Sequence, residues 1–494
     1  MSKICLAVSE HDIDSAVKQI MNYQDNIDLA EIRADYLERD ELEGIDRLPA
    51  KTQVPLIFTL RRKSDGGRYQ GDEEERAVIL GRAAASGYEY LDLESDVRFD
   101  SVESKCKKTG CRIIRSLHDF AGVPENLSDL IEALSSARGE IPKLAIMPQS
   151  ISDLMQIISA ADSHRGKEKI IIGMGPWGFL TRILAKRLGS YLTFTSPVDR
   201  EAAPGHIDPL TLCDTYRFRE ISGSAEVFCV IGNPIMHSRS PWIHNPALRS
   251  LDSDSVYVPI QVDDVPLFFR SAETLGVKGI SVTVPHKQAV RACLDLESEA
   301  VGAVGSCNTV YRKDNEWHGT NTDVGGFLVS LADMIGNLNL SGARISVIGA
   351  GGTSRAIVYA LSQRGADVCI FNRTKEKARD LSAEFSCEWA PLIPSAKDLI
   401  GKYSDVIIQT TSAGMHPNTN LDPIEFYNFS GSEMVYDVIY APPETPMLAR
   451  ARAAGCSTRN GEQMLLEQAY LQFELFTGEA YPEACRSIDV FSPD

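Results

Sequence analysis

The chain has 494 residues, 43% of them hydrophobic and 24% charged, and its formal net charge is −18. This length is more than one hydrophobic core normally serves, so several domains are expected. The acidic balance argues against nucleic acid or an anionic membrane surface as the main partner, and no apolar run approaches the length of a membrane span.

The N-terminal residues, MSKICLAVSE, enter a strand-like run at once and carry neither the apolar core of a signal peptide nor a transit segment. The eleven cysteines are odd in number and form no C-x-x-C pair, which is typical neither of a disulfide framework nor of a zinc site. We therefore expect a cytoplasmic protein with reduced thiols and no bound metal.

Eight short strand-like runs, from KICLAVS to YLTFTSP, occupy the first half of the chain. Amphipathic stretches such as residues 73–87 and 151–164 lie between them. Eight strands that alternate with helices predict a closed (β/α)8 TIM barrel. An open doubly wound sheet is the alternative, and the barrel is favoured because no glycine-rich phosphate turn follows the first strand.

The sixth run, PKLAIMP, carries a lysine inside apolar sequence. In a strand, Lys143 and Ala145 point to one face and Leu144 to the other. Inside a barrel the Lys143 amine would be desolvated, which lowers its pKa and allows it to attack a ketone and form a Schiff base. A strand-end lysine whose amine reaches water is the alternative.

Other polar residues stand where the neighbouring strands are expected to end. His118, in SLHDF, suits general acid/base chemistry. The remaining members of this set are Glu31, Arg33, Arg61 and Arg182. Active sites of (β/α)8 barrels lie at the carboxyl ends of the strands, so the set predicts an active site, and its arginines indicate an anionic substrate.

The first half resembles the type I 3-dehydroquinate dehydratases throughout. Lys143 matches the Schiff-base lysine of that family and His118 its general acid/base. The polar and carboxylate-binding positions of the family are matched by Glu31, Arg33, Arg61 and Arg182. Ser9 matches its first-strand contact, and Asp65 stands where the family often has Glu. The resemblance implies a syn elimination of water from 3-dehydroquinate through a lysine imine, without a metal.

The closing loop departs from that family. Its usual sequence, S-A-P-G-Q, reads AAPGH here, from Ala202 to His206. A Ser/Gln lid would hydrogen-bond the substrate and exclude water. Because Ala202 cannot form such a hydrogen bond, we expect either that His206 replaces the glutamine or that the dehydratase is slow.

A short polar linker, Ser222–Ser224, precedes the second half, which opens with strand–helix alternation. Residues 343–374 then contain a strand, the turn GAGGTSRA, a helix and a second strand, which is the pattern of a dinucleotide-binding Rossmann unit. Ala356 falls near the third glycine of the usual motif. The turn residues that would approach a pyrophosphate are Gly349, Ala350, Gly351 and Gly352.

The second strand of this unit ends in Asn372, Arg373 and Thr374, and Lys377 follows one turn later. NAD-binding units usually have an acid there that binds the ribose 2′-OH, whereas Arg and Lys suit a 2′-phosphate. The predicted cofactor is therefore NADP.

Lys287 and Asp323 are the ionisable pair that we expect to supply a proton to a ketone oxygen during reduction. Lys287 lies in VPHK and Asp323 in NTD, at expected strand–loop junctions. For a Lys–Asp pair taken alone, a surface ion pair is the alternative.

The second half closely resembles the shikimate dehydrogenases over nearly all its length, and the resemblance assigns the catalytic pair of that family to Lys287 and Asp323. It implies substrate contacts at Ser238, Ser240, Thr283, Asn308, Tyr440 and Gln468, with Arg239 where Lys is common. It implies cofactor contacts at Glu299, Val438 and Gly461 as well. The implied reaction is the reduction of 3-dehydroshikimate to shikimate with NADPH.

We expect an α/β protein in three parts: a dehydratase barrel at 1–222, a shikimate-binding lobe at 223–330 completed by C-terminal helices at 460–494, and an NADP-binding Rossmann lobe at 331–459. Such a fusion would catalyse consecutive steps of the shikimate pathway of aromatic amino acid biosynthesis. Its partners would be small molecules, neither nucleic acid nor membrane, and its oligomeric state stays open. The alternatives are a quinate/shikimate dehydrogenase with a degraded barrel, and a ligand-sensing or scaffold protein that keeps both folds without turnover.

Overall fold

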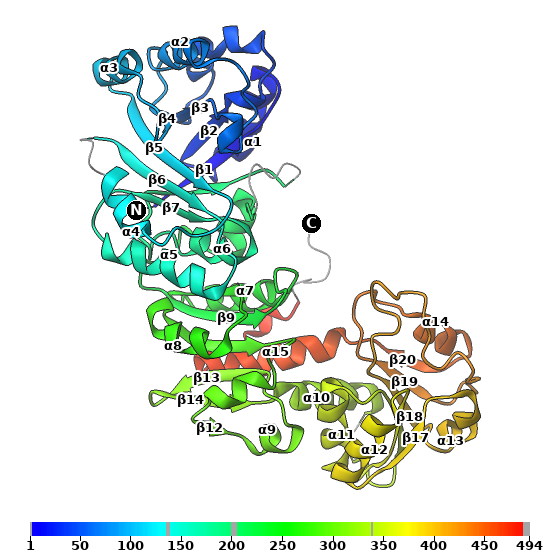
Figure 1. Ribbon diagram of the computed structural model, residues 1–494. Coiled ribbons are helices and arrows are strands. Elements are labelled where there is room, and N and C mark those ends of the chain that lie inside the picture. Colours follow the sequence, from blue (N-terminus) through cyan, green and yellow to red (C-terminus); the bar gives the residue numbers. More distant parts are fainter. Residues whose placement is uncertain (1, 135–138, 199–204, 337–338, 488–494) are drawn as a thin grey trace. The chain divides into compact units, whose positions relative to one another are not determined.

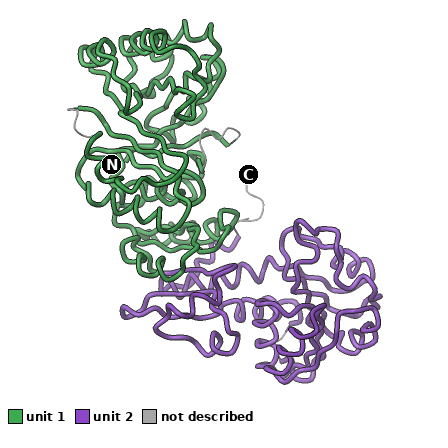
Figure 2. The backbone as a smooth tube through the Cα atoms, viewed as in Figure 1, with its two compact units in different colours: residues 1–278 green, residues 279–494 purple. Residues whose placement is uncertain are grey.

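A computed structural model describes residues 2–134, 139–198, 205–336 and 339–487 (Figure 1). The chain divides into two compact units, Met1–Lys278 and Gly279–Asp494, which Figure 2 shows in different colours. Across the described residues, no helix is both long and apolar enough to span a membrane.

The first unit begins with eight parallel strands that form a nearly closed barrel, as predicted. Their order is β7-β6-β5-β4-β3-β2-β1-β8, so each strand lies beside its neighbour in sequence and β8 pairs with β1. The strands are β1 Lys3–Val8, β2 Leu29–Arg33, β3 Leu56–Thr59, β4 Tyr90–Glu94, β5 Arg112–Asp119, β6 Ile141–Ile146, β7 Ile170–Gly173 and β8 Leu192–Thr195.

Helices follow most of these strands: α1 Ile13–Tyr23, α2 Glu73–Ala83, α3 Asp100–Thr109, α4 Leu127–Leu134, α5 Ile151–Ser163 and α6 Gly175–Ile183. Side-chain caps define several of their starts. Asp12 accepts a hydrogen bond from the backbone N–H of Ser15 at the start of α1, and Ser150 does the same for α5. Figure 1 shows these helices around the outside of the barrel strands.

The barrel interior is layered. An apolar cluster fills it with side chains from all eight strands, including Leu29, Tyr90 and Ile141. Since side chains alternate along a strand, the residues two positions further on point inward as well. Those residues are polar and buried in five neighbouring strands: Glu31, Thr59, Asp92, Ser116 and Lys143. A polar layer therefore lies above the apolar one, toward the carboxyl ends of the strands.

The rest of the first unit contains β9 Glu226–Gly232, α7 Ser240–Ser250, β10 Ser255–Gln261 and α8 Val265–Leu275. Strands β9 and β10 pair in parallel over their full lengths. Strand β11, Val277–Val282, runs from the first unit into the second.

The second unit opens with β12 Leu296–Glu297, α9 Glu299–Val304, β13 Thr309–Lys313, β14 Glu316–Thr320 and α10 Thr322–Ile335. Strand β13 pairs antiparallel with both β11 and β14, and β12 pairs in parallel with β14. Helix α15, Glu462–Thr477, packs along α10.

A six-stranded parallel sheet forms the rest of the second unit, in the order β17-β16-β15-β18-β19-β20. Numbered from its first strand this order is 3-2-1-4-5-6, which confirms the predicted Rossmann topology. The strands are β15 Arg344–Ile348, β16 Asp367–Asn372, β17 Glu388–Pro391, β18 Val406–Gln409, β19 Met434–Asp437 and β20 Ser457–Arg459.

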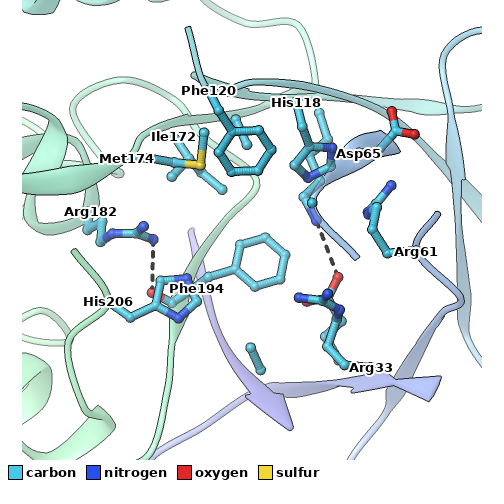
Figure 3. Close-up of a pocket in the computed structure, with 15 residues that line it drawn as sticks. Arg33, Arg61, Asp65, His118, Phe120, Ile172, Met174, Arg182, Phe194 and His206 are labelled. Atoms are coloured by element: carbon cyan, nitrogen blue, oxygen red, sulfur yellow. Dashed lines mark hydrogen bonds and ion pairs between the residues drawn. The ribbon is translucent and has the colours of Figure 1, made fainter. Parts of the chain in front are cut away.

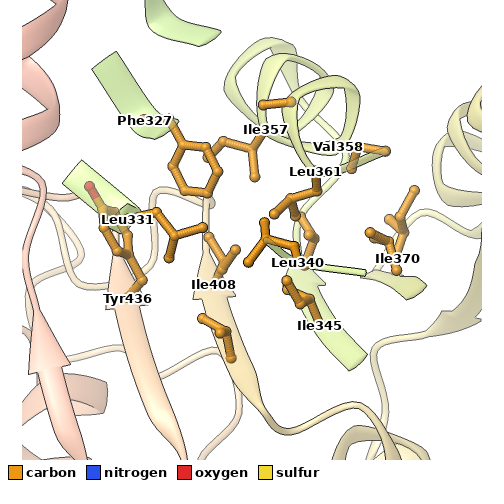
Figure 4. Packing of buried hydrophobic residues seen from close by; sticks show 14 of the residues in the cluster. Phe327, Leu331, Leu340, Ile345, Ile357, Val358, Leu361, Ile370, Ile408 and Tyr436 are labelled. Carbon is orange, nitrogen blue, oxygen red and sulfur yellow. The ribbon is translucent and has the colours of Figure 1, made fainter. Parts of the chain in front are cut away.

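Helices α11 Gly352–Ser362, α12 Lys375–Phe385, α13 Lys397–Lys402 and α14 Pro446–Ala453 connect these strands. Figure 4 shows the core that α10 and α11 form with the sheet. Phe327 and Leu331 of α10 meet Ile357 and Leu361 of α11 above Ile408 of β18. This packing fixes the start of α11 at the carboxyl edge of the sheet.

Candidate active sites

The polar end of the barrel encloses a cavity of about 130 Å³ (Figure 3). Six side chains predicted from the sequence line it: Glu31, Arg33, Arg61, His118, Lys143 and Arg182. They come from β2, from the residues that follow β3, from β5 and β6, and from α6. Closure of the barrel therefore brings together side chains that are up to 151 positions apart, the separation of Glu31 and Arg182.

Lys143 is only 4% exposed and lies against two carboxylates. Its Nζ is 3.0 Å from Asp92 Oδ2 and 3.3 Å from Glu31 Oε1. On its other side, Nζ lies 4.3 Å from the centroid of the Phe194 ring. The amine therefore points into the barrel, and the alternative of a strand-end lysine reaching water is wrong.

His118 faces the same cavity from β5 and stacks beside Phe120, with ring centroids 6.4 Å apart. Its Nδ1 has no hydrogen-bond partner among the described residues. Burial lowers the pKa of His118 well below its ordinary value, and the nearby charges of Arg61 and Lys143 lower it further. The ring is therefore neutral near pH 7 and can accept a proton.

Three arginines surround the cavity, and each is less than 10% exposed. Arg33 forms a bidentate pair with Asp35, at 2.8 and 2.9 Å. Arg182 donates to the backbone carbonyl of Phe194 at 3.4 Å. Buried guanidinium groups beside a cavity suit a substrate carboxylate.

Arg61 lies between two acids of β4, with Nη2 2.8 Å from Asp92 Oδ1 and Nη1 3.3 Å from Glu94 Oε1. Burial alone would lower the pKa of Arg61, but Asp92 and Glu94 outweigh it and raise this pKa. Burial by itself would raise the pKa of Asp92. The positive charges of Arg61 and Lys143 outweigh that effect and hold the pKa of Asp92 well below its usual range. Asp92 is therefore ionised.

Asp92, which contacts both Lys143 and Arg61, is a residue of this site that the sequence did not lead us to predict. The signal was present in YLDLE, where two acids alternate with apolar residues in a buried strand. Of the remaining predictions, Asp65 lines the cavity, whereas Ser9 is buried but is not among the lining residues. His206 lines the cavity too, and Ala202 lies outside the described residues.

In the second unit, Lys287 and Asp323 form the predicted pair, with Nζ 2.5 Å from Oδ2. Asp323 lies in the first turn of α10, where Asn321 caps the helix. Asn308 donates to the other oxygen of Asp323 at 2.8 Å and lies 3.4 Å from Gln468 Oε1. Both carboxylate oxygens of Asp323 thus have a partner. The side chain of Lys287 is 25% exposed.

The other predicted substrate contacts are distributed along the chain. Thr283 lies four residues before Lys287, in the segment that follows β11. Ser238 and Ser240 belong to the first unit, at the start of α7, and their hydroxyl oxygens are 3.2 Å apart.

Tyr440 lies in the segment that follows β19. The side chain of Asp437, at the end of that strand, hydrogen-bonds two residues of the segment. Asp437 accepts hydrogen bonds from the backbone N–H of Ile439 at 3.0 Å and from Thr445 Oγ1 at 2.7 Å. Burial raises the pKa of Asp437 to about 7. Gly461 packs against the same segment, because a Cβ at Gly461 would lie 2.0 Å from the backbone oxygen of Val438.

The predicted nucleotide turn lies between β15 and α11, at the point where the strand order reverses. Gly349 has φ +124°, and a side chain there would meet Thr410 Oγ1 at 2.4 Å. By contrast, a Cβ at Gly351 or Gly352 would meet nothing within 4 Å. The N-terminus of α11 is therefore open to a phosphate group, and the turn fits a dinucleotide.

The residues after β16 complete the predicted NADP site. Arg373, Thr374 and Lys377 are exposed, and Asn372 donates to the backbone carbonyl of Thr374 at 2.9 Å. These cations stand where an NAD-binding unit has an acid. Glu299 begins α9, which packs against α11.

Four family models match the chain. The type I 3-dehydroquinase model covers residues 4–223, and the shikimate dehydrogenase substrate binding domain covers 230–310. The shikimate/quinate 5-dehydrogenase model covers 330–421, and the shikimate 5′-dehydrogenase C-terminal domain covers 461–485.

The bifunctional 3-dehydroquinate dehydratase/shikimate dehydrogenase of Arabidopsis thaliana, a chloroplastic protein, is 33% identical over 505 residues, which span 98% of this chain and 83% of the relative. A shikimate dehydrogenase (NADP(+)) of Shouchella clausii is 38% identical over 262 residues, 52% of this chain and 95% of the relative. The crystal structure of a shikimate dehydrogenase from Aquifex aeolicus is similar over 54% of this chain and 97% of its own, with 33% identity and a TM-score of 0.50. A shikimate dehydrogenase in complex with NADP+ has 30% identity and the same TM-score over 54% of this chain and 94% of its own.

Proposed function

Since the chain belongs to the family of bifunctional enzymes that join a type I 3-dehydroquinate dehydratase to a shikimate dehydrogenase, we propose that Lys143 and His118 catalyse its first reaction and that Lys287 and Asp323 catalyse its second. The protein dehydrates 3-dehydroquinate to 3-dehydroshikimate and reduces that product to shikimate with NADPH. The observation that carries the first assignment is the burial of the Lys143 amine between Asp92 and Glu31 in the barrel cavity.

In the dehydratase reaction, the Lys143 amine adds to the ring ketone, and loss of water gives an imine. The imine acidifies the adjacent C–H bond. Neutral His118 takes that proton, and the electron pair then expels the ring hydroxyl, which leaves as water with the proton that His118 returns. Hydrolysis of the imine frees the ketone product and the Lys143 amine. Arg33, Arg61 and Arg182 would bind the substrate carboxylate.

In the dehydrogenase reaction, NADPH supplies the hydride when it is bound. Lys287 would donate a proton to the ketone oxygen as negative charge develops there, and Asp323 orients the lysine. Asn308 and Gln468 would contact the substrate. The other substrate contacts that we propose are Ser238, Ser240, Thr283 and Tyr440. The NADP contacts would be Glu299, Gly349, Ala350, Gly351, Gly352, Asn372, Arg373, Thr374, Lys377, Val438 and Gly461.

We propose that the functional parts are a barrel at 1–222, a shikimate-binding lobe at 223–330 completed by helices at 460–494, and an NADP-binding lobe at 331–459. The residues matched by the four family models support this division. We further propose a cytoplasmic location, which the eleven free cysteines support.

The test is to mix the protein with 3-dehydroquinate and NADPH and to follow NADPH absorbance. Steady consumption without another enzyme is expected, and Lys143→Ala should abolish it while leaving turnover of added 3-dehydroshikimate intact. If only 3-dehydroshikimate is consumed by the wild-type protein, the barrel is impaired and the proposed roles of Lys143 and His118 fail. If neither substrate is consumed, the alternative of a sensor is favoured.

A further inference from the structure

A row of alternating charges connects helix α2 with Lys143; we call it the charge row. It consists of Arg76, Glu94, Arg61, Asp92 and Lys143. Arg76 contacts Glu94 directly through Nη2. Glu94 Oε1 lies 3.3 Å from Arg61, whose other nitrogen lies 2.8 Å from Asp92. Asp92 in turn lies 3.0 Å from Lys143 Nζ.

Arg76 is completely buried and does not line the cavity. Its Nε donates to the backbone carbonyl of Leu60 at 3.0 Å, and its Nη1 lies 2.9 Å from Glu73. A buried ion pair costs desolvation energy that well-packed apolar side chains would not. The position of Arg76 in the charge row therefore calls for a reason other than stability.

We propose that Arg76 is a positioning residue for the dehydratase: by pairing with Glu94 it leaves Arg61 free to pair with Asp92, so that Asp92 is shared between Arg61 and Lys143. This inference rests on the proposed role of Lys143 as the imine-forming residue. Arg76 acts only through the charge row and does not touch the substrate.

The direction of its effect follows from Coulomb's law. Without Arg76, Glu94 would carry an unneutralised charge and would draw Arg61 away from Asp92. Both changes favour the ammonium form of Lys143, so the reactive amine would form only at higher pH. The substitution removes none of the other groups that face Lys143 or its cavity, which are Cys5, Glu31, Arg33, Asp65, His118, Arg182 and His206, with the ring of Phe194.

The experiment measures how fast cyanoborohydride traps 3-dehydroshikimate on Lys143 between about pH 5.5 and 9, together with the pH profile of dehydratase kcat/KM. In Arg76→Met, the midpoint of trapping is expected to move to higher pH by about half to one unit. In the double variant R76M/E94Q it should return toward the wild-type value, because both charges are removed together. A purely structural role would make the double variant worse, not better.

Arg115→Met is the matched control. Arg115 is 1% exposed, and its carboxylate partners, Glu140 at 2.7 Å and Glu103 at 3.0 Å, are outside the charge row. It contacts Glu94 through the backbone carbonyl, at 3.5 Å, and not through the carboxylate. Its loss should leave the midpoint of trapping unchanged. Glu94→Gln alone should move that midpoint to lower pH, which keeps the test decisive if R76M does not fold.

The proposal is overturned if E94Q leaves the midpoint where it is in the wild type, or if R76M folds and shows no shift. A shift of the same size in R115M would overturn it as well, since any lost buried arginine would then have the effect. A wild-type protein that is not trapped at Lys143 would instead refute the proposed function, which is a separate result.

Discussion

At the scale of single residues, the two histidines of the barrel cavity behave alike. Burial lowers the pKa of His206 well below its ordinary value, and Arg182 and Arg33 lower it further. His118 is held neutral in the same way, by burial and by Arg61. The Nδ1 atoms of both rings have no hydrogen-bond partner among the described residues, so each ring can still bind a ligand or a proton.

These histidines make the barrel less stable in acid. Below about pH 6.5 the unfolded chain protonates both rings, while the folded chain keeps them neutral. The unfolded state then binds more protons, and the free energy of unfolding falls as the pH decreases. His206→Gln removes one of the two groups, so the urea midpoint at which dehydratase activity is lost should fall less between pH 7 and 5.5 than in the wild type.

The exposed His11 provides the control for this experiment, because its ring contacts the backbone carbonyl of Tyr36, at 3.1 Å, and lies outside the barrel cavity. His11→Gln should keep the wild-type dependence on pH. An equal fall of the urea midpoint in H206Q and in the wild type would contradict the neutral state assigned to His206.

At the scale of elements, α6 reaches the cavity because it packs unusually close to β7. A Cβ at Gly178 would lie 2.1 Å from the backbone carbon of Gly173, and a Cβ at Gly173 would lie 2.6 Å from Gly178 Cα. Only glycine at both positions allows this approach. Arg182 follows Gly178 by four residues on the same helix and lines the cavity.

Gly178→Ala should therefore displace α6 and move Arg182 away from the cavity. Overpacking of this kind costs about 1–3 kcal/mol of stability. We expect the KM for 3-dehydroquinate to rise about tenfold or more, and reduction of 3-dehydroshikimate to stay unchanged in steady-state assays. Gly81→Ala in α2 is the control, since its Cβ would have no neighbour closer than 3.5 Å and both activities should survive. A normal KM in G178A would show that α6 tolerates the added methyl group.

The turn between β16 and α12 decides the choice of cofactor in our proposal. Arg373 is exposed there and would pair with the 2′-phosphate that distinguishes NADPH from NADH. Loss of a charge-assisted hydrogen bond costs about 1.5–3 kcal/mol. Arg373→Ala should thus raise the KM for NADPH by roughly tenfold or more and leave the KM for NADH nearly unchanged.

Arg379, further along α12, is the matched control for that substitution. It is exposed and pairs with Asp380 at 2.8 Å. Arg379→Ala should leave both KM values as they are in the wild type. If R373A raises the KM for both cofactors equally, the 2′-phosphate contact is refuted.

At the scale of the whole molecule, the catalytic residues that we propose for the two activities lie in separate units. Lys143 and His118 lie in the first unit, and Lys287 and Asp323 lie in the second. A mixture of Lys143→Ala and Lys287→Ala proteins should therefore convert 3-dehydroquinate to shikimate, because each protein supplies one step and the intermediate diffuses between them. NADPH consumption by the mixture, and by neither variant alone, is the expected result. A mixture that stays inactive would mean that the intermediate must pass within one chain.

The sequence by itself was enough to predict the order of the elements and most of the candidate reactive groups. Eight alternating runs predicted the barrel, and the glycine turn at 349–352 predicted the Rossmann unit, because side-chain period and turn chemistry are local properties. The stretch PKLAIMP alone left two possibilities for Lys143, an inward amine or a strand-end amine that reaches water, and the polar residues at the neighbouring strand ends favoured the first.

Only the tertiary structure decided what surrounds that amine. Asp92 and Glu31 lie 51 and 112 positions from Lys143, and nothing local in the sequence pairs them with it. Closure of the barrel places β2, β4 and β6 around one interior, where buried charges must find partners because water cannot solvate them. The same closure draws Arg76 of α2 into the charge row, a connection that no periodicity in the sequence could reveal.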